Sequence, residues 1–416
     1  MPGAQTPLQM ASQLAHLPGL VLLESATATS TKGLSLVTAA PKKVLRGHIA
    51  TDWHLIAEHL SVQSHDHNNG KVPPVGGLFG WVGFDGEFCF GIYPEVLAFD
   101  HHHQSWSEWG TLSTQLCQRK LGRAPHLQFQ PLVEREAFVT AVKSAQSYIA
   151  AGDIYQVNLS HPWQAPWPEG ADALAFYHQL QQSSPAPFAA FLSLAGTEVF
   201  SSSPECFLRM SGRQIETRPI KGTRPRFPAH PAKDLASAKA LAASVKEQAE
   251  LLMITDLERN DLGQVCEFGS VHVPELAAVE SFAQVFHLVS TVCGTLRPEM
   301  DHAAAFKACF PGGSISGAPK RRALEIIAEL EHHTRGLYTG AIGYFGFNGE
   351  SQFNIVIRTA IREGQTITFH AGAGIVADSV PEHEYEETLH KAAGILAAAN
   401  PRPKKIPAPA QDRHED

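Results

Sequence analysis

The chain has 416 residues, long enough for one large or two modest domains with full cores. Its formal net charge is -8, from 33 basic and 41 acidic residues, which argues against a nucleic-acid-binding protein. The sequence contains no CxxC pair and no apolar run of the roughly 18 residues that a membrane span needs. We therefore expect a globular cytoplasmic protein without a membrane segment, zinc site or disulfide framework.

The first 130 residues alternate short apolar runs with clusters of Gly, Pro and His. We interpret residues 1–130 as an N-terminal lobe, in which 76–83 is a buried strand. Apolar residues at helical spacing then predict a helix over 134–151 that Gly152 closes. This helix stands near the start of a second and larger domain at 131–399.

Short strands follow in pairs. Residues 188–194 and 197–201 flank Ala195-Gly196, and residues 206–210 and 213–220 flank Ser211-Gly212, which predicts two hairpins. The stretch 234–257 is rich in Ala, Leu, Lys and Glu and lacks Gly and Pro, which predicts one helix.

The remaining pattern predicts a strand over 285–296, a helix over 319–331, a meander, and a last helix over 379–399 before a tail at 400–416. The meander strands are 337–347, 353–362 and 366–370, with turns at Asn348-Gly349 and Glu363-Gly364. Antiparallel meanders separated by helices predict an α+β fold with layered antiparallel sheets and flanking helices.

Two predicted helices carry paired carboxylates. Glu247 and Glu250 share one helix face, and Glu384 and Glu387 share another, with Lys391 one turn further on. If the two faces meet, the four carboxylates need a cation, and oxygen ligands of this kind suit Mg²⁺. Two solvated helix faces would show the same spacing.

Glu205 and Lys221 form a second candidate pair. A turn at Ser211-Gly212 places Glu205 opposite Arg218, with Lys221 just past the same end of the hairpin. A general acid beside a nucleophilic amine would fit this arrangement, and so would a surface salt bridge.

A third group collects around the meander. The predicted turns place Arg358 opposite Thr339, next to Tyr338, on one side and opposite Phe369 on the other, and Gly372 and Gly374 follow. Such groups would bind a small carboxylate, although the glycines could also mark a bulge or a tight turn. His287 lies within a predicted strand and by itself indicates a core histidine.

Five motifs in chain order resemble those of the chorismate-utilising enzymes. They are PIKGT at 219–223, DLERNDL at 256–262, PGGSISGAPK at 311–320, YTGAIGY at 338–344 and AGAGIV at 371–376. The resemblance covers residues 130–398 strongly and residues 20–130 weakly. It implies an anthranilate synthase component I-like fold with a deep central cleft.

The resemblance also implies roles for individual residues. Glu205 would be the general acid on the C4 hydroxyl of chorismate, and Mg²⁺ would be held by Glu250 and Glu387 with help from Glu247 and Glu384. The residues implied to hold the substrate carboxylates are Tyr338, Arg358, Gly372, Gly374 and Lys391, with Thr223, His287 and Ser316 nearby.

Two positions distinguish members of this family. Water-adding members usually carry a lysine base where this chain has Gln156, so we expect ammonia as the nucleophile. Anthranilate synthases usually carry Ala where this chain has Lys221, and a lysine there is typical of aminodeoxychorismate synthases. The resemblance implies covalent attack by this lysine on the ring. One departure is Leu251, where family members often have His after the metal-binding glutamate.

The expected reaction is chorismate plus ammonia to 4-amino-4-deoxychorismate, for 4-aminobenzoate and folate biosynthesis. The alternatives are an anthranilate synthase component I and a catalytically silent homologue that binds chorismate or a partner. The sequence contains no GxCxG-like nucleophile string and no lyase domain. We therefore expect a separate glutamine amidotransferase subunit to supply ammonia and a separate aminodeoxychorismate lyase to act on the product.

Overall fold

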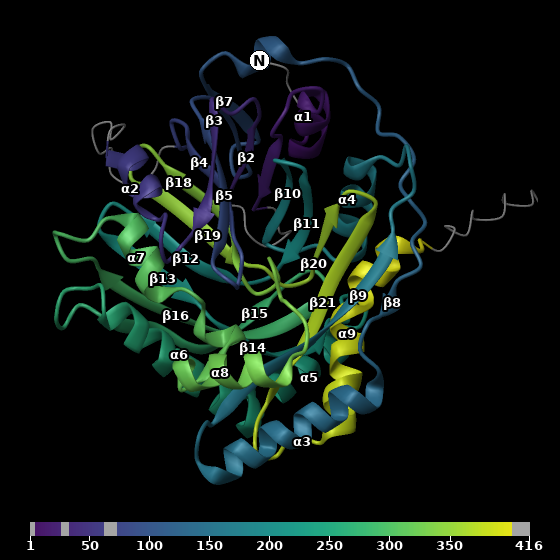
Figure 1. Ribbon diagram of the computed structural model, residues 1–416, viewed down its shortest axis with the longest axis vertical. Coiled ribbons are helices and arrows are strands. Elements are labelled where there is room, and N and C mark those ends of the chain that lie inside the picture. Colours follow the sequence, from purple (N-terminus) through teal and green to yellow (C-terminus); the bar gives the residue numbers. More distant parts are fainter. Residues whose placement is uncertain (1–4, 26–32, 62–72, 402–416) are drawn as a thin grey trace, which may run out of the picture.

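Two antiparallel sheets lie face to face and carry helices on their outer faces (Figure 1). The computed structural model describes residues 5–25, 33–61 and 73–401. Every strand pair within this part of the chain is antiparallel, which confirms the α+β prediction. The predicted tail from 402 onward lies outside the described residues.

The first sheet joins strands from both ends of the chain. Its order is β17 (Gly317–Ala318), β9 (Gln156–Pro166), β21 (Thr366–Ile375), β20 (Thr359–Glu363), β11 (Thr197–Ser203), β10 (Phe188–Leu194), β1 (Val21–Glu24), β2 (Leu34–Thr38), β6 (Val96–Asp100) and β7 (Ser105–Trp109), with β8 (Gln130–Pro131) beside β9.

The second sheet is built in the same way. Its order is β14 (Ile220–Pro225), β16 (Val285–Thr295), β13 (Gln214–Arg218), β12 (Cys206–Ser211), β19 (Glu350–Ile355), β18 (Ala341–Gly346), β4 (Gly77–Val82), β5 (Glu87–Tyr93) and β3 (Lys43–His48), with β15 (His272–Ser281) beside β16. Strands from residues 1–130 therefore extend both sheets, through the pairs β1–β10 and β4–β18.

Alternation along the strands sorts the apolar side chains into layers. Ala190 and Leu192 of β10 belong to the cluster between the sheets, whereas Phe191 faces the helices outside. This is the two-residue period of a strand buried on both faces.

The helices cover the outer faces. Helices α1 (Pro7–Leu14), α4 (Ala173–Ser183) and α9 (Pro381–Ala399) cover the first sheet, and α2 (His54–Ser61) and α7 (His302–Cys309) cover the second. Helices α3 (Arg135–Ala151) and α8 (Lys320–Leu330) cover β9 and β21, and α5 (Pro231–Ala242) and α6 (Val245–Gly263) lie against β14 and β16. None of the helices in the described ranges is long and apolar enough to cross a membrane. The six cysteines are free thiols.

Two element predictions were wrong. The helix predicted over 234–257 is divided into α5 and α6, because Ser244 caps a new helix and accepts a hydrogen bond from the Glu247 N–H at 3.4 Å. The strand predicted over 353–362 is divided into β19 and β20, which belong to different sheets. The chain crosses between the sheets at 356–358, where Arg358 has φ +51°.

Three predicted registers were also wrong, each because of where a glycine sits in its turn. Ser211 pairs with Gln214, so Gly212 is the first central residue of its turn (φ +54°), as a type II′ turn requires. Gly364 (φ +60°) does the same before β21, and a three-residue loop ending at Gly349 joins β18 to β19. Glu205 is therefore not opposite Arg218, and Arg358 faces neither Thr339 nor Phe369 as a strand partner.

We predict that Trp53→Ala destabilises the protein by about 3–5 kcal/mol, because it removes the centre of an aromatic cluster in the second sheet's core. The Trp53 ring contacts Phe88 and stacks on Phe306 at 5.4 Å, and its N–H donates to the Ala303 carbonyl at 2.8 Å. Urea denaturation measures the loss. Trp109, which is 49% exposed, is the matched control, and its replacement by Ala should change stability by less than about 0.5 kcal/mol. Equal losses in the two variants would contradict the assignment of Trp53 to the core.

Candidate active site

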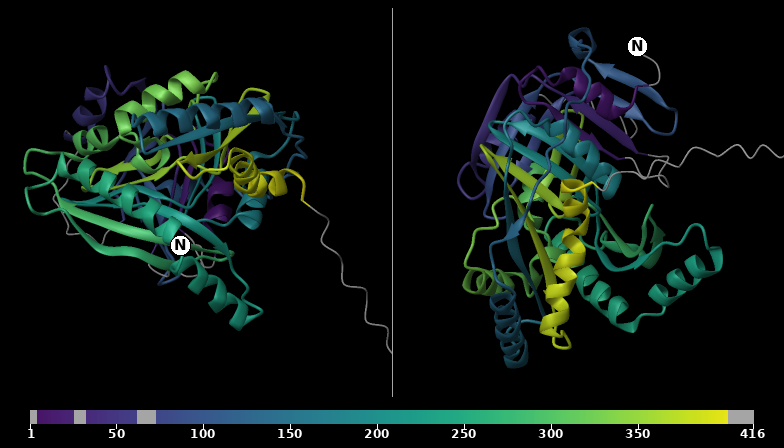
Figure 2. Two further views of the ribbon diagram at one scale, coloured as in Figure 1. Left: turned by 90° about the horizontal axis from the view of Figure 1, so that it is seen from below. Right: turned by 90° about the vertical axis from the view of Figure 1, so that its right-hand side faces the viewer.

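The candidate residues gather at the end of the sandwich where β9 and β21 of the first sheet approach β14 and β16 of the second. Helix α9 stands on one side and α5 and α6 on the other, as the right-hand view of Figure 2 shows. Lys221 of β14 is central to the group. Its amine interacts electrostatically with Glu250 of α6, with Lys391 and Glu387 of α9, and with Glu205.

Two chain crossovers between the sheets position Glu205 and Arg358. Glu205 lies between β11 and β12, and Arg358 lies between β19 and β20. The crossovers are hydrogen-bonded to each other: the Ile355 N–H donates to the Glu205 carbonyl and the Ser202 N–H donates to the Arg358 carbonyl, both at 3.1 Å. The guanidinium is consequently close enough to the Glu205 carboxyl for the two charges to interact.

The environment favours the neutral forms of both Glu205 and Lys221. Glu205 is 5% exposed, and burial raises the pKa of its carboxyl, although the Ser314 hydroxyl and the Ile220 N–H donate hydrogen bonds to it. Burial lowers the pKa of the Lys221 amine, and the Glu250 carboxylate partly opposes this shift. A protonated carboxyl beside a neutral amine is the arrangement that a general acid and a nucleophile require.

The glycines of β21 form a floor without side chains. Gly372 and Gly374 pair regularly with Ser160 and Asn158 of β9, so they mark neither a bulge nor a turn. A methyl group on Gly374 would lie 3.0 Å from Gln156 Nε2 and 3.5 Å from Lys221 Nζ. The missing side chains thus leave space between polar groups of both sheets.

Polar atoms without partners face this floor. Both amide atoms of the fully buried Gln156 lack a hydrogen-bond partner within the described part of the chain, as does Asn158 Oδ1. A methyl group on Gly372 would lie 2.8 Å from Asn158 Oδ1 and 2.8 Å from the Tyr338 hydroxyl. Buried orphan groups of this kind indicate a ligand site. The sequence prediction missed Asn158, although its position two residues after Gln156 places both side chains on one strand face.

The other predicted binding residues surround the floor. His287 Nδ1 lies 3.1 Å from the Thr223 hydroxyl and 3.1 Å from the Gly222 carbonyl. Burial and then the Arg358 charge lower the pKa of His287 to about 4, so its imidazole is neutral near pH 7. The Tyr338 ring stacks on His370 at 5.0 Å. The Ser316 hydroxyl instead donates to the Gly312 carbonyl at 2.9 Å, so it braces its own loop.

Four glutamates approach one another from α6 and α9. Burial and then the neighbouring Glu250 raise the pKa of Glu247, and burial also raises the pKa of Glu384, which accepts a hydrogen bond from Ser379. Burial opposes ionisation of Glu387, but Lys391, 2.7 Å away, outweighs it and the pKa is lowered.

These carboxylates do not form a closed ligand cage. In the described ranges, no three or more His, Cys, Asp or Glu side chains are gathered as a metal site. Mutually repelling carboxylates that approach from two helices nevertheless fit a hard cation, because Mg²⁺ commonly takes one or two carboxylates and completes its shell with water and substrate oxygens.

A buried ion pair that the sequence prediction missed holds three segments of the site together. Arg335 is 3% exposed and binds Glu331 at 2.8 Å. Its guanidinium also donates to the carbonyls of Asn158 (2.7 Å) and Ile315 (3.2 Å) and to the Thr339 hydroxyl (3.1 Å). The sequence pattern that could have predicted this pair is its i, i+4 spacing at the end of a predicted helix.

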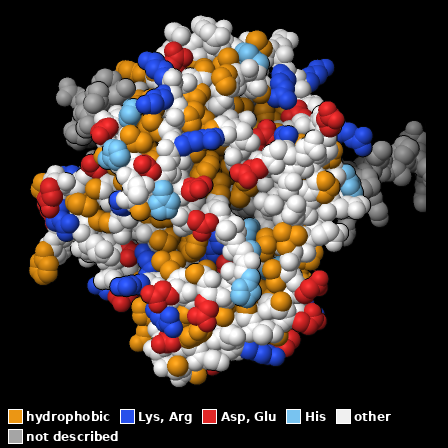
Figure 3. Space-filling view, in the orientation of Figure 1, with side chains coloured by type: hydrophobic (Ala, Val, Ile, Leu, Met, Phe, Trp, Pro, Cys, Tyr) orange, Lys and Arg blue, Asp and Glu red, His pale blue; other side chains and the backbone are white. Residues whose placement is uncertain are grey.

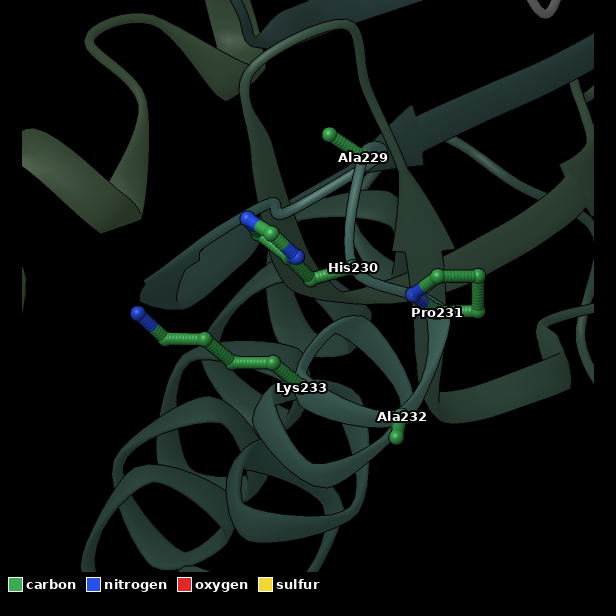
Figure 4. Close-up of a pocket in the computed structure, with 5 residues that line it drawn as sticks. All are labelled: Ala229, His230, Pro231, Ala232 and Lys233. Atoms are coloured by element: carbon green, nitrogen blue, oxygen red, sulfur yellow. The ribbon is translucent and has the colours of Figure 1, made fainter.

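The surface around the site is mixed in charge. Figure 3 shows hydrophobic side chains along the middle of one face, with Lys and Arg interspersed among Asp and Glu rather than gathered into a basic stripe. A separate shallow hollow at the beginning of α5 is lined by Ala229–Lys233 (Figure 4), and none of the candidate residues lines it.

Known proteins resemble this chain over most of its length. The family model of chorismate binding enzymes matches residues 23–397. The chain is 40% identical over 360 residues to aminodeoxychorismate synthase component 1 of Escherichia coli (79% of this chain, 78% of that protein). It is 36% identical over 397 residues to an anthranilate synthase component 1 of Haloarcula marismortui (84% and 77%). Anthranilate synthase component I of Streptococcus pneumoniae superposes with a TM-score of 0.77 at 28% identity, covering 89% of this chain and 94% of that one.

We predict that Glu331→Gln destabilises the protein by about 3–5 kcal/mol, because it leaves the Arg335 charge buried without a counter-charge. Chemical denaturation of wild type and variant measures the difference. Glu386→Gln is the matched control: it breaks the pair with Arg135 at 3.0 Å, in which both side chains are 47% exposed, and should cost at most about 1 kcal/mol. A cost for Glu331→Gln no greater than that of the control would refute the role of this pair.

Proposed function

We propose a specific reaction for this chain, which belongs to the family of chorismate binding enzymes. In this proposal the protein is an aminodeoxychorismate synthase component I, which converts chorismate and ammonia to 4-amino-4-deoxychorismate and water. The observation that carries the proposal is Lys221, an amine that burial holds toward its neutral form at the centre of the site. A family member that used no covalent step would not need a nucleophile there.

In the proposed first step, the Lys221 amine attacks C2 of the ring while Glu205 transfers its proton to the C4 hydroxyl, which leaves as water. Ammonia then attacks C4 and expels the lysine amine from C2, and a proton from the adding ammonia restores Glu205. Two displacements replace one difficult one. Both groups return to their starting state, so the net change is the exchange of a hydroxyl for an amino group.

The other residues orient the substrate and select the nucleophile. Arg358, Tyr338 and Lys391 are proposed to hold the carboxylates of chorismate over the glycine floor, where bare backbone lets the ring come close. The Gln156 amide is a poor base and leaves water unactivated, whereas its free carbonyl oxygen can accept a hydrogen bond from ammonia.

Glu250 and Glu387, assisted by Glu247 and Glu384, would hold Mg²⁺. When bound, the ion would offset the negative charge of the substrate's ring carboxylate. We further propose that a glutamine amidotransferase subunit supplies the ammonia and that a separate lyase converts the product to 4-aminobenzoate for folate synthesis.

A second candidate function is that of anthranilate synthase component I, because several relatives of comparable sequence identity carry that name. That reaction would release pyruvate, and it gives Lys221 no evident role. A catalytically silent homologue is the third, but burial raises the pKa of Glu205 and lowers that of Lys221, which favours the uncharged forms that catalysis requires.

We predict that the purified protein, given chorismate, Mg²⁺ and ammonium at mildly alkaline pH, forms 4-aminobenzoate only after a lyase is added. Lys221→Ala should lower this rate by at least about 100-fold, because the covalent step is lost. Chromatography of the products, with a coupled assay for pyruvate, measures both reactions. Lys239→Ala, at an exposed lysine of α5, is the control and should keep full activity. Anthranilate and pyruvate from the wild type would establish the second candidate, and a folded protein without turnover would favour the third.

We predict that saturating Mg²⁺ raises the unfolding temperature, since a ligand at 100 times its Kd stabilises the folded state by about 2.7 kcal/mol. Glu250→Gln and Glu387→Gln should each abolish the rise, and chelation should abolish turnover. Thermal denaturation with and without Mg²⁺ measures the effect. Glu386→Gln, one residue from Glu387 but half-exposed, serves as the control and should keep the full rise. A rise that persists in both site variants would place the ion elsewhere.

A further inference from the structure

Two neighbouring side chains of β9 present buried amide groups to the glycine floor. Gln156 is fully buried and Asn158 is 8% exposed, and they share one face of the strand because they are two residues apart. Within the described ranges, Gln156 Oε1 and Asn158 Oδ1 accept no hydrogen bond. A buried acceptor without a donor costs free energy, so these two oxygens indicate a ligand that supplies N–H or O–H groups.

The two amides lie over the gaps that the glycines of β21 leave. A methyl group on Gly374 would lie 3.0 Å from Gln156 Nε2 and 3.5 Å from Lys221 Nζ. A methyl group on Gly372 would lie 2.8 Å from Asn158 Oδ1. The amides therefore border the amine that is displaced in the second step of the proposed reaction.

A short turn connects Asn158 with the general acid. The Asn158 N–H donates to the Ser316 carbonyl at 2.9 Å. Two residues earlier, in the 3₁₀ turn η2 (Gly313–Ile315), the Ser314 hydroxyl donates a hydrogen bond to the Glu205 carboxyl. The turn thus contacts β9 on one side and Glu205 on the other, so the amides of β9 lie toward the part of the site where the C4 hydroxyl would be protonated.

The two reactants differ in the donors that they offer. Chorismate carries two carboxylates and an enol ether, which only accept hydrogen bonds, and one hydroxyl, which leaves as water in the first step. Ammonia has three N–H donors and one lone pair. It is therefore the reactant that matches buried amide oxygens without donors.

A third acceptor forms during the reaction. Once Glu205 has given its proton to the leaving hydroxyl, its carboxylate can also accept a hydrogen bond. Ammonia held between this carboxylate, Gln156 Oε1 and Asn158 Oδ1 uses all three N–H groups, and its lone pair is left free for C4. Water in the same place would leave one acceptor empty, and its attack on C4 would only reverse the first step and regenerate chorismate.

The same acceptors favour the transition state of the second step. While the bond from nitrogen to C4 forms and the bond from Lys221 to C2 breaks, the attacking nitrogen becomes positive until one proton passes to Glu205. A charged donor makes a stronger hydrogen bond than a neutral one. Amide oxygens that are already in place therefore bind the transition state more tightly than they bind free ammonia.

We propose that Gln156 and Asn158 form the binding site for ammonia, in which their side-chain oxygens accept two N–H groups and the Glu205 carboxylate accepts the third. Asn158 is then a specificity-determining residue for the second substrate. The proposal rests on the proposed function, in which ammonia adds at C4.

The test is the dependence of turnover on each substrate in Asn158→Leu, which keeps the size of the side chain but removes the acceptor. At constant pH, kcat/KM for ammonia should fall by about 10- to 100-fold, because a hydrogen bond to a charged group is lost. The KM for chorismate at saturating ammonia should hold. Gln164→Leu, at the far end of the same strand, is the control and should leave both constants in place.

Oxygen exchange separates the ammonia step from the first step. In ¹⁸O-labelled water without ammonia, return of the lysine-bound ring to chorismate would place the label in the C4 hydroxyl. Asn158→Leu should exchange at the wild-type rate, because Lys221 and Glu205 carry out that step. An unchanged kcat/KM for ammonia, or exchange that falls as much as amination does, would overturn the proposal while the proposed function stands.

Stability gives a readout that does not depend on turnover. An amide without a partner in the free protein contributes nothing to stability, so Asn158→Leu should keep or raise the unfolding temperature. Asn354→Leu is the matched control, because Asn354 is 4% exposed but accepts from the Ile342 N–H at 3.2 Å and donates to the Phe188 carbonyl at 2.9 Å. That variant should lower the unfolding temperature by several degrees.

The two proposals can fail separately. An equal fall of the unfolding temperature in Asn158→Leu would assign its amide to the fold and overturn the ammonia site, even if the protein makes no product. Anthranilate and pyruvate from the wild type would overturn the proposed function instead. A selective loss of kcat/KM for ammonia in Asn158→Leu would still support the site in that case.

Discussion

The site depends on one constraint: two of the crossovers between the sheets, from β11 to β12 and from β19 to β20, are bonded to each other. The Ile355 N–H reaches the Glu205 carbonyl, the Ser202 N–H reaches the Arg358 carbonyl, and the Ser203 hydroxyl donates to the Ile355 carbonyl at 2.6 Å. An acid and a cation that are about 150 residues apart in sequence are therefore held in one place by backbone. Arg358 has φ +51°, a conformation that costs a non-glycine residue energy and that the surrounding packing must impose.

Everything else in the site is arranged around this junction from separate elements. Lys221 comes from an edge strand of the second sheet, the glycine floor from the first, and the glutamates from the helices α6 and α9. The Arg335–Glu331 pair stabilises the other end, where one guanidinium joins β9, the 3₁₀ turn Gly313–Ile315 and Thr339, which itself has φ +62°. Two backbone conformations that disfavour side chains thus flank the site, and each is held by hydrogen bonds from a neighbouring segment.

The sequence was sufficient for what depends on local pattern. The helix that Gly152 ends (φ +83°), the buried strand β4 and the last helix all follow from periodicity and capping. The registers failed, because a sequence reading Ser-Gly or Glu-Gly does not state which turn position the glycine takes, and Gly212 and Gly364 take the first. The sequence prediction missed the end of β19 at Ile355 for a different reason. An apolar run keeps the same alternation when it leaves one sheet and enters another, so only tertiary packing reveals where the strand ends.

Motif resemblance identified most of the candidate residues. It does not show how deeply they are buried, and burial is what shifts their pKa values. A lysine beside glutamates reads equally well as a salt bridge until the structure places it among buried groups. The same burial that favours a neutral Lys221 amine also favours a neutral Glu205 carboxyl, and it outweighs the cations that face the acid. An active site that needs an acid and an amine both uncharged, and also needs cations for an anionic substrate, meets these requirements where burial outweighs the attraction between the cations and the carboxylate.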